Sequence, residues 1–167
     1  MLPAMPRKHP KKIVRRYTPS PAPLPARLAP AFAGLLQVFS DASQRRHGGL
    51  AAVLFADADG EPLVVTRTVA VHGSNELELQ AALFALAQAR LHFPGRPLAL
   101  FSDNRDAIDR LDRACRLGLA VDPQLAALLA PEDLAGMLAL STFHWVRAHA
   151  SCRGNLLADR HAALAAA

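Results

Sequence analysis

Short apolar runs separated by polar turns recur along the chain and predict the strands of one sheet. The first run, at 35–39, is rich in branched and aromatic side chains and favours a strand buried on both faces. Two further runs, at 52–55 and 63–71, flank a polar turn at 57–60 that is typical of a β-hairpin. With the glycine pair at 48–49 expected in the preceding turn, the three runs predict an antiparallel meander.

Helical periodicity begins after this meander and alternates with two more strand-like runs. A long helix is predicted from Ser74, because leucines and alanines form a wide apolar surface there. The run at 96–103 then predicts a strand, and 104–116 predicts a second amphipathic helix. A final strand is predicted at 138–146, followed by a final helix from Gly154.

The order of these elements predicts the fold class. Between the second helix and the last strand, two prolines near first turns predict two short helices within 117–139. A strand that follows a helix of this length is expected to lie parallel to the first strand, through a right-handed crossover. The sequence therefore predicts an α/β fold: a mixed five-stranded sheet, three antiparallel strands and then two parallel ones, flanked by helices on both faces.

Acidic residues stand where these elements begin or end. Asp41 follows the first run and Asp103 the fourth, so the parallel arrangement predicts both at the same end of neighbouring strands. Two adjacent carboxylates repel each other and have raised pKa values unless a cation lies between them. Glu78 and Asp159, in early turns of the first and last long helices, are further candidates. Glu76 competes with Glu78, whose apolar neighbours place it nearer the buried side; either acid also complements the helix dipole.

The excess of positive over negative charge lies in the amino-terminal part of the chain. The net charge is +5, but residues 1–40 contain seven Lys and Arg and no acidic residue. The remaining residues contain twelve Arg and fourteen acids, a net charge of −2. Eight of the thirteen prolines lie in residues 1–30, a composition typical of disordered or polyproline II chain. We therefore expect a basic, proline-rich, disordered tail over 1–33 and a folded domain over 34–167.

Three explanations remain open for the basic tail. The first explanation is a solubilising segment, or the product of a mis-set start codon. The second is an arm that contacts nucleic-acid phosphates, and the third is an organelle-targeting peptide. The last is disfavoured because the prolines would break the amphipathic helix that such a peptide needs.

The composition also predicts the cellular compartment and the oligomeric state. Cys115 and Cys152 are too few for a disulfide framework and indicate a reducing compartment, so we expect a cytoplasmic protein. No apolar run reaches the roughly 18 residues that a membrane span needs, so no membrane partner is expected. The chain shows no heptad or self-complementary stripe, and we expect a monomer.

Four segments together resemble the type 1 ribonuclease H family. They are FSDAS at 39–43, SNELELQAALFAL at 74–86, FSDNRDAI at 101–108 and WVRAHASCRGNLLADRHAALA at 145–165. The resemblance covers roughly residues 35–166 in the order, spacing and type of element. It implies a ribonuclease H-like sheet, and the family's four carboxylates match Asp41, Glu78, Asp103 and Asp159.

The resemblance implies hydrolysis of the RNA strand of RNA–DNA hybrids, with 3′-hydroxyl and 5′-phosphate products, by two bound Mg²⁺ ions or by Mn²⁺. In the family pattern Asp41 bridges both ions and Asp159 completes the site that holds the attacking water. Glu78 and Asp103 face the leaving oxygen. His149 matches the family's mobile-loop histidine, which assists proton movement or product release.

Substrate contacts follow from the same resemblance. Ser74, Asn75, Asn104 and Asn155 stand in the matching segments and are the expected substrate-binding residues. They would read the 2′-hydroxyl that distinguishes RNA from DNA, although capping a helix is an equally good role for the first three. The chain lacks the lysine-rich, tryptophan-bearing handle of the best-known bacterial members, so the basic tail is a candidate source of the missing phosphate contacts.

Three functions remain to be separated. The first is a metal-dependent endoribonuclease that cuts the RNA strand of RNA–DNA hybrids. The alternative is a non-catalytic nucleic-acid-binding module of ribonuclease H fold, which the presence of all four acids disfavours. A third is a nuclease of the same fold that acts on double-stranded or structured RNA.

Overall fold

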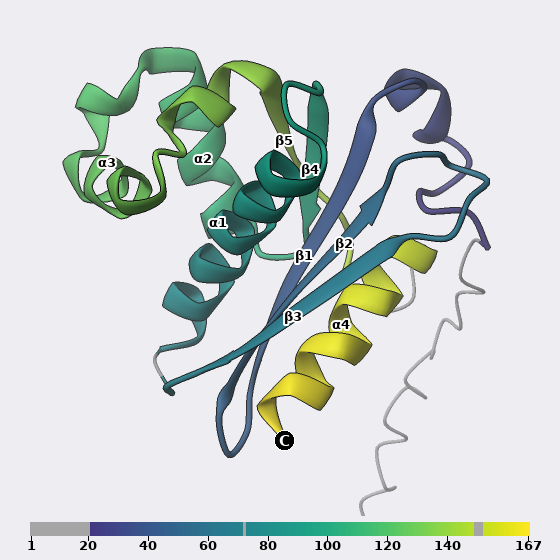
Figure 1. The fold of residues 1–167 in the computed structure, drawn as a ribbon, viewed down its shortest axis with the longest axis horizontal. Coiled ribbons are helices and arrows are strands. Elements are labelled where there is room, and N and C mark those ends of the chain that lie inside the picture. The colour runs from purple at the N-terminus through teal and green to yellow at the C-terminus, as the bar shows by residue number, and fades with distance from the viewer. Residues whose placement is uncertain (1–20, 72, 149–151) are drawn as a thin grey trace, which may run out of the picture.

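One mixed sheet organises the fold, which the computed structural model describes for residues 21–71, 73–148 and 152–167. Its strands are β1 Leu36–Gln44, β2 Gly48–Phe55, β3 Leu63–Val69, β4 Leu98–Ser102 and β5 Ser141–Trp145. They lie in the order β3-β2-β1-β4-β5 (Figure 1). β1 pairs antiparallel with β2 and parallel with β4. The outer pair β2–β3 is also antiparallel, and the outer pair β4–β5 is also parallel. The predicted fold class is confirmed.

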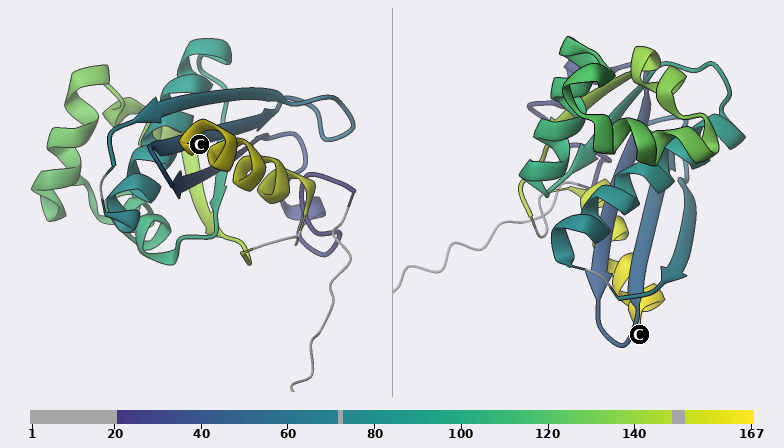
Figure 2. Two further views of the ribbon diagram at one scale, coloured as in Figure 1. Left: turned by 90° about the horizontal axis from the view of Figure 1, so that it is seen from below. Right: turned by 90° about the vertical axis from the view of Figure 1, so that its left-hand side faces the viewer.

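Helices cover both faces of this sheet. They are α1 Ser74–His92, α2 Arg105–Leu117, α3 Pro123–Leu129 and α4 Arg153–Ala166. α1 packs on one face of β1 and β2 and α4 on the other, while α2 lies beside β4 and β5 (Figures 1 and 2). Over the ranges that the structure describes, no helix combines the length and the apolar character needed to cross a membrane.

The central strand β1 is buried on both faces because alternate side chains enter two different cores. Leu36 and Val38 belong to the larger core, which α1 and α2 cover. Phe39 points the other way, into a smaller core beneath α4. There its ring stacks on Phe101 at a centroid distance of 5.0 Å and meets Phe55 edge-on at 5.9 Å. A strand with two buried faces has a continuous apolar pattern, as the sequence shows at 35–39.

Close helix–sheet approach explains two glycines. A Cβ on Gly49 would lie 2.1 Å from the carbonyl oxygen of Ala162 in α4, and a Cβ on Gly154 would lie 2.4 Å from the ring of Phe39. Both positions therefore admit only glycine without rearrangement. Gly48 and Gly49, which the sequence pattern placed in a turn, instead begin β2, and the bends lie at residues 45–47. Contact with α4, rather than turn geometry, is what requires Gly49.

The folded part begins earlier than the boundary at residue 34 that the sequence suggests. Leu24 is only 1% exposed and packs in the smaller core, and a short 3-10 helix runs over Ala29–Phe32. The backbone oxygens of Ala22 and Pro23 accept hydrogen bonds from the amides of Arg153 (3.1 Å) and Gly154 (3.2 Å). Residues 22–32, here called the N-terminal strap, therefore connect the segment before β1 to the beginning of α4. A proline-rich segment can therefore be ordered when one of its apolar side chains is buried in the core.

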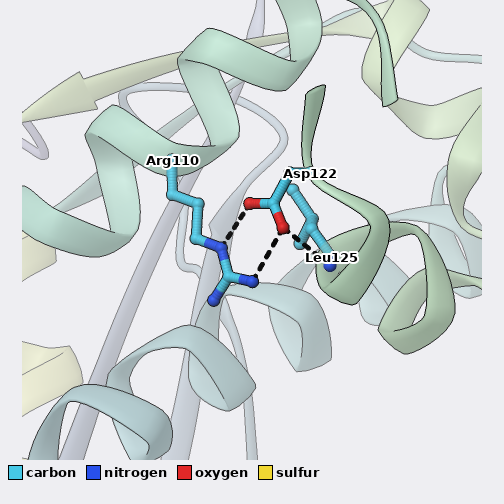
Figure 3. Close-up of polar contacts among 3 residues, drawn as sticks. All are labelled: Arg110, Asp122 and Leu125. Atoms are coloured by element: carbon cyan, nitrogen blue, oxygen red, sulfur yellow. Dashed lines mark hydrogen bonds and ion pairs between the residues drawn. The ribbon is translucent and has the colours of Figure 1, made fainter. Parts of the chain in front are cut away.

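The region between α2 and β5 contains one true helix and several 3-10 turns. α3 begins at Pro123, as predicted, and Asp122 caps it by accepting a hydrogen bond from the amide of Leu125 at 3.0 Å. Arg110 of α2 donates to both carboxylate oxygens of Asp122, at 2.5 and 2.9 Å (Figure 3). The second predicted helix is instead two 3-10 segments, Ala130–Glu132 and Ala135–Leu140. Between them Asp133 has a φ of 51°, a left-handed conformation that ends helical winding.

Candidate metal centre

Three carboxylates meet at one end of the sheet. Asp41, Glu78 and Asp103 each offer an oxygen atom, and these three atoms all lie within 4.8 Å of one another. They come from β1, from the first turns of α1 and from the residue after β4. This is the convergence that the strand-end pattern predicts, although Asp41 lies inside β1 rather than at its end, because β1 continues to Gln44.

Asp41 is held by the middle of the sheet. It pairs with Ala51 of β2 and is only 4% exposed. The backbone amide of Ala42 donates to its Oδ1 at 2.9 Å. Asp41 therefore lies on the central strand, where its backbone is paired with β2 beyond the last β1–β4 pair, Phe39 with Phe101.

Glu78 rather than Glu76 faces this cluster. Its neighbours Leu77 and Leu79 are buried against the sheet, whereas Glu76 is exposed. The two glutamates point about 200° apart on the helix, so one faces the sheet and the other faces solvent. The prediction that Glu78, and not Glu76, points toward the buried side of the helix is confirmed.

Asp103 occupies a tight connection between β4 and α2. Asn104 caps α2, because its Oδ1 accepts a hydrogen bond from the amide of Ala107 at 2.9 Å. The amide of Asn104 itself donates to the Oγ of Ser102 at 3.1 Å. These contacts hold the backbone on the carboxyl side of Asp103 and direct its side chain toward the cluster.

The environment favours the protonated forms of Asp41 and Glu78. Burial raises the pKa of Asp41, and the negative charges of Glu78 and Asp103 raise it further. Burial also raises the pKa of Glu78, with Asp103 as the next cause, while a hydrogen bond with Asp41 acts in the opposite direction. Such crowding of like charges in a desolvated site disfavours ionisation of all the acids together, unless a cation is present.

The donor set fits a hard divalent cation. All three residues contribute carboxylate oxygens, which Mg²⁺ and Mn²⁺ prefer to sulfur or to a set of imidazoles. The Oε2 atom of Glu78 is buried without a hydrogen-bond partner. A buried orphan acceptor is costly, and a cation would satisfy it. The residues present are therefore compatible with one or more divalent ions.

Asp159 lies near this group without being part of it. It is partly buried in the second turn of α4, and its charge contributes to raising the pKa values of Asp41 and Glu78. The electrostatic effect is the smallest of the causes for either residue. His149, the remaining predicted catalytic residue, lies outside the described residues.

The predicted substrate-binding residues divide into two places. Ser74 and Asn75 are exposed at the start of α1, and the Nδ2 of Asn104 donates to the Oδ1 of Asn75 at 3.2 Å. Neither Ser74 nor Asn75 caps the helix, because the cap position is Gly73 and has no side-chain hydrogen bond. Asn155 is 1% exposed in α4, and its Nδ2 donates to the backbone oxygen of Arg147 at 3.3 Å. It thus tethers the segment that precedes residue 149.

One residue that touches the centre was not predicted from the sequence. The indole Nε1 of Trp145 donates to the backbone oxygen of Asp103 at 3.0 Å. The sequence does show a tryptophan at the end of a predicted strand, just before a polar loop. Its hydrogen-bond partner, Asp103, is remote in the chain and can be identified only once β4 is known to pair with β5.

Comparison with known proteins adds to this geometry. No protein-family model matches the sequence, and no curated protein matches it. Among solved structures, ribonuclease H1 from the archaeon Halobacterium salinarum has a TM-score of 0.54 and 20% identity, over 79% of this chain and 97% of that one. The N-terminal ribonuclease H domain of a Mycobacterium tuberculosis protein has a TM-score of 0.57 and 20% identity, with 78% and 94% covered.

A third structure is LC11-ribonuclease H1 in complex with an RNA/DNA hybrid, with a TM-score of 0.55 and 17% identity over 75% of this chain and 92% of that one. At such identities the similarity shows the fold. The chain has a ribonuclease H-like fold, with a three-carboxylate group at one end of its sheet.

Proposed function

We propose that this protein is a divalent-metal-dependent ribonuclease H that hydrolyses the RNA strand of RNA–DNA hybrids. The observation that carries the proposal is the meeting of Asp41, Glu78 and Asp103 within 4.8 Å on a ribonuclease H-like sheet. Such a centre suits metal-dependent hydrolysis of a phosphodiester, because carboxylates would hold divalent ions and these ions would stabilise the negative charge that develops on the attacking and leaving oxygens.

The three carboxylates, with Asp159, are the proposed ligands of two Mg²⁺ ions, for which Mn²⁺ is the alternative. Bound ions would supply an activated water at neutral pH and neutralise the leaving oxygen. Asp41, fixed on the central strand, is the proposed shared ligand. Asp159 is assigned to the side of the attacking water, and Glu78 with Asp103 to the side of the leaving oxygen. His149 is proposed to move a proton or assist product release in the loop before α4.

Hybrid binding is supported by the neighbourhood of the acids and by one of the solved relatives, which was determined with an RNA/DNA hybrid. Asn75 and Asn104 form a hydrogen-bonded pair next to Asp103. Their amides offer donors and acceptors of the kind that read a 2′-hydroxyl in a minor groove. Ser74 and Asn155 complete the proposed set. The basic residues before position 21 are the proposed source of additional phosphate contacts.

Cleavage of a labelled hybrid tests the activity. We expect RNA-strand cleavage in Mg²⁺, with 5′-phosphate ends, to fall by about 10³-fold in Asp103→Asn, since losing a ligand charge removes roughly 4 kcal/mol of transition-state stabilisation. Asp106→Asn is the matched control, because Asp106 is an exposed aspartate in the first turn of α2. It should cleave at the wild-type rate. Equal activity of the two variants would refute the acidic centre as the catalytic site.

Binding measured beside cleavage separates the enzyme from a binding module. A protein that binds the hybrid but leaves it uncut in both Mg²⁺ and Mn²⁺ would be a non-catalytic module of this fold. Cleavage of double-stranded RNA in preference to the hybrid would reassign the substrate. A chain that lacks residues 1–20 should bind the hybrid more weakly, with a salt dependence shallower by about 0.9 for each phosphate that the tail no longer neutralises. This truncation leaves the N-terminal strap in place.

A further inference from the structure

Trp145 extends the β4–β5 ladder by one side-chain hydrogen bond. Ser102 and Trp145 are partners in the parallel register, and the amide of Val146 donates to the backbone oxygen of Ser102 at 3.0 Å. β4 ends at Ser102, so backbone pairing ends there. The indole Nε1 of Trp145 then donates to the next carbonyl oxygen, that of Asp103, at 3.0 Å.

The peptide group after Asp103 is consequently held at both of its polar atoms. Its oxygen accepts from Trp145, and its nitrogen, the amide of Asn104, donates to the Oγ of Ser102 at 3.1 Å. A peptide unit is planar, so two hydrogen bonds on opposite edges restrict rotation about the preceding Cα–C bond. That rotation is the one that would swing the backbone at Asp103 relative to Asp41 and Glu78.

The indole is itself held in place by Arg105. The Arg105 guanidinium carbon lies 4.3 Å from the centroid of the Trp145 ring, a cation–π distance. Trp145 remains 43% exposed, so burial alone does not fix the orientation of its ring. Arg105 is the first residue of α2, directly after the capping Asn104. The contact therefore returns to the same short connection that carries Asp103.

We propose that Trp145 is a positioning residue that sets the backbone of Asp103, and through it the cation affinity of the acidic centre, with Arg105 holding the indole against the connection. The inference rests on the proposed function to the extent that Asp41, Glu78 and Asp103 bind a divalent ion. Trp145 does not touch the ion or the substrate in this role. It acts by keeping the third carboxylate within reach of the other two.

Calorimetric titration of Mn²⁺ into the full chain tests this role without any reaction. Trp145→Phe keeps an aromatic ring and removes the N–H donor. We expect its Mn²⁺ affinity to be roughly fivefold weaker, the loss that one neutral hydrogen bond of about 1 kcal/mol produces. Arg105→Lys keeps the charge near the site but loses the planar stack, and we expect a smaller loss of about twofold.

A destabilising change elsewhere on the same strand serves as the control. Phe143→Leu alters a buried residue of the larger core, two positions before Trp145 on β5. It should lower Tm while leaving Mn²⁺ affinity unchanged. Hybrid cleavage by Trp145→Phe should recover as Mg²⁺ is raised, because the defect lies in cation binding. A variant whose role was only to stabilise the fold would show no such recovery.

The wild-type protein provides a second measurement that does not depend on a variant. Trp145 is the only tryptophan of the chain, so its indole N–H gives a single, unambiguous NMR signal. Slow exchange of this proton, with a shift on addition of Mg²⁺, is expected. Exchange at the rate of a free indole, or equal Mn²⁺ affinity in wild type and Trp145→Phe, would overturn the positioning role and leave the proposed function standing. Absence of divalent-ion binding to the wild type would overturn both.

Discussion

Asp41 on the central strand β1 and Glu78 on α1 bring carboxylate oxygens within 4.8 Å of each other, although they belong to different layers of the fold. Burial contributes most to raising the pKa of each, and their negative surroundings add to it. A folded protein that crowds acids in this way is less stable than it would be without them, unless a cation offsets the repulsion. The stability of the fold should therefore depend on both pH and divalent ions.

Without divalent ions, the free energy of unfolding should fall as the pH rises from the ordinary carboxyl pKa, 3.8 for Asp41, toward the raised values. The sign follows because the folded state holds protons that the unfolded state has released. Urea denaturation in EDTA at pH 5 and pH 8 measures the fall. Asp41→Asn should be more stable than wild type at pH 8, by about 1 to 3 kcal/mol. Mg²⁺ should restore the free energy of unfolding of the wild type at pH 8, and it should have no such effect on Asp41→Asn.

The Arg110–Asp122 pair has the opposite pH dependence. Hydrogen bonding from Arg110 lowers the pKa of Asp122 to about 2, and the Asp122 carboxylate also caps α3. Its contribution to stability is therefore present above pH 3.8 and is lost as the pH falls toward 2. Asp122→Asn should cost about 1 to 2 kcal/mol at pH 7, because the amide carries no charge and keeps only one acceptor oxygen, so the bidentate contact with Arg110 is lost.

Asp112→Asn is the control for that change. Asp112 also pairs with an arginine, Arg116, at 3.0 Å, but both side chains are largely exposed. An exposed pair one helical turn apart contributes only about 0.3 to 0.5 kcal/mol. Denaturation of both variants at pH 7 compares them directly. If the two variants lose the same free energy of unfolding, the bidentate contact in Figure 3 stabilises the fold no more than an exposed ion pair does.

Leu24 anchors the N-terminal strap. Its side chain is 1% exposed, next to core residues of β1, β2 and α4. Leu24→Ala should therefore lower the free energy of unfolding by about 2 to 4 kcal/mol, the usual cost of an emptied leucine site. Leu164→Ala changes the same residue type at a position that is 66% exposed, and it should cost less than about 0.5 kcal/mol. A chain lacking residues 1–20 should keep the wild-type Tm, whereas one lacking residues 1–24 should not.

Gly49 tests the approach of α4 to the sheet. An added Cβ would meet the backbone of α4, at 2.1 Å from the Ala162 oxygen and 2.7 Å from the Ala166 nitrogen. Backbone cannot yield as a flexible side chain does, so Gly49→Ala should cost about 3 kcal/mol or more in unfolding experiments. Gly136→Ala is the matched change, since nothing lies within 4 Å of its added Cβ. It should be neutral or slightly stabilising; a similar loss at both positions would argue against helix contact as the cause.

Local sequence determined much of this protein. The apolar run before Asp103 and the capping Asn104 after it define a strand, a connection and a helix within a few residues. Such features depend on side-chain periodicity and on hydrogen bonds between near neighbours, which a linear pattern contains. The same is true of α3, which begins at the predicted proline, and of the choice of Glu78 over Glu76 by its apolar neighbours.

Tertiary structure alone decided how remote segments meet. Gly49 lies in β2 through its pairing with β1 and β3, and it must be glycine because α4 approaches it closely. Leu24 is ordered because its side chain packs in the smaller core, although its own segment has the composition of a disordered chain. Asn75 does not cap α1 but accepts a hydrogen bond from Asn104, and Trp145 reaches the carbonyl of Asp103. The physical reason is that burial and hydrogen bonding across the sheet depend on which surfaces pack together. The order of residues along one segment does not contain that information.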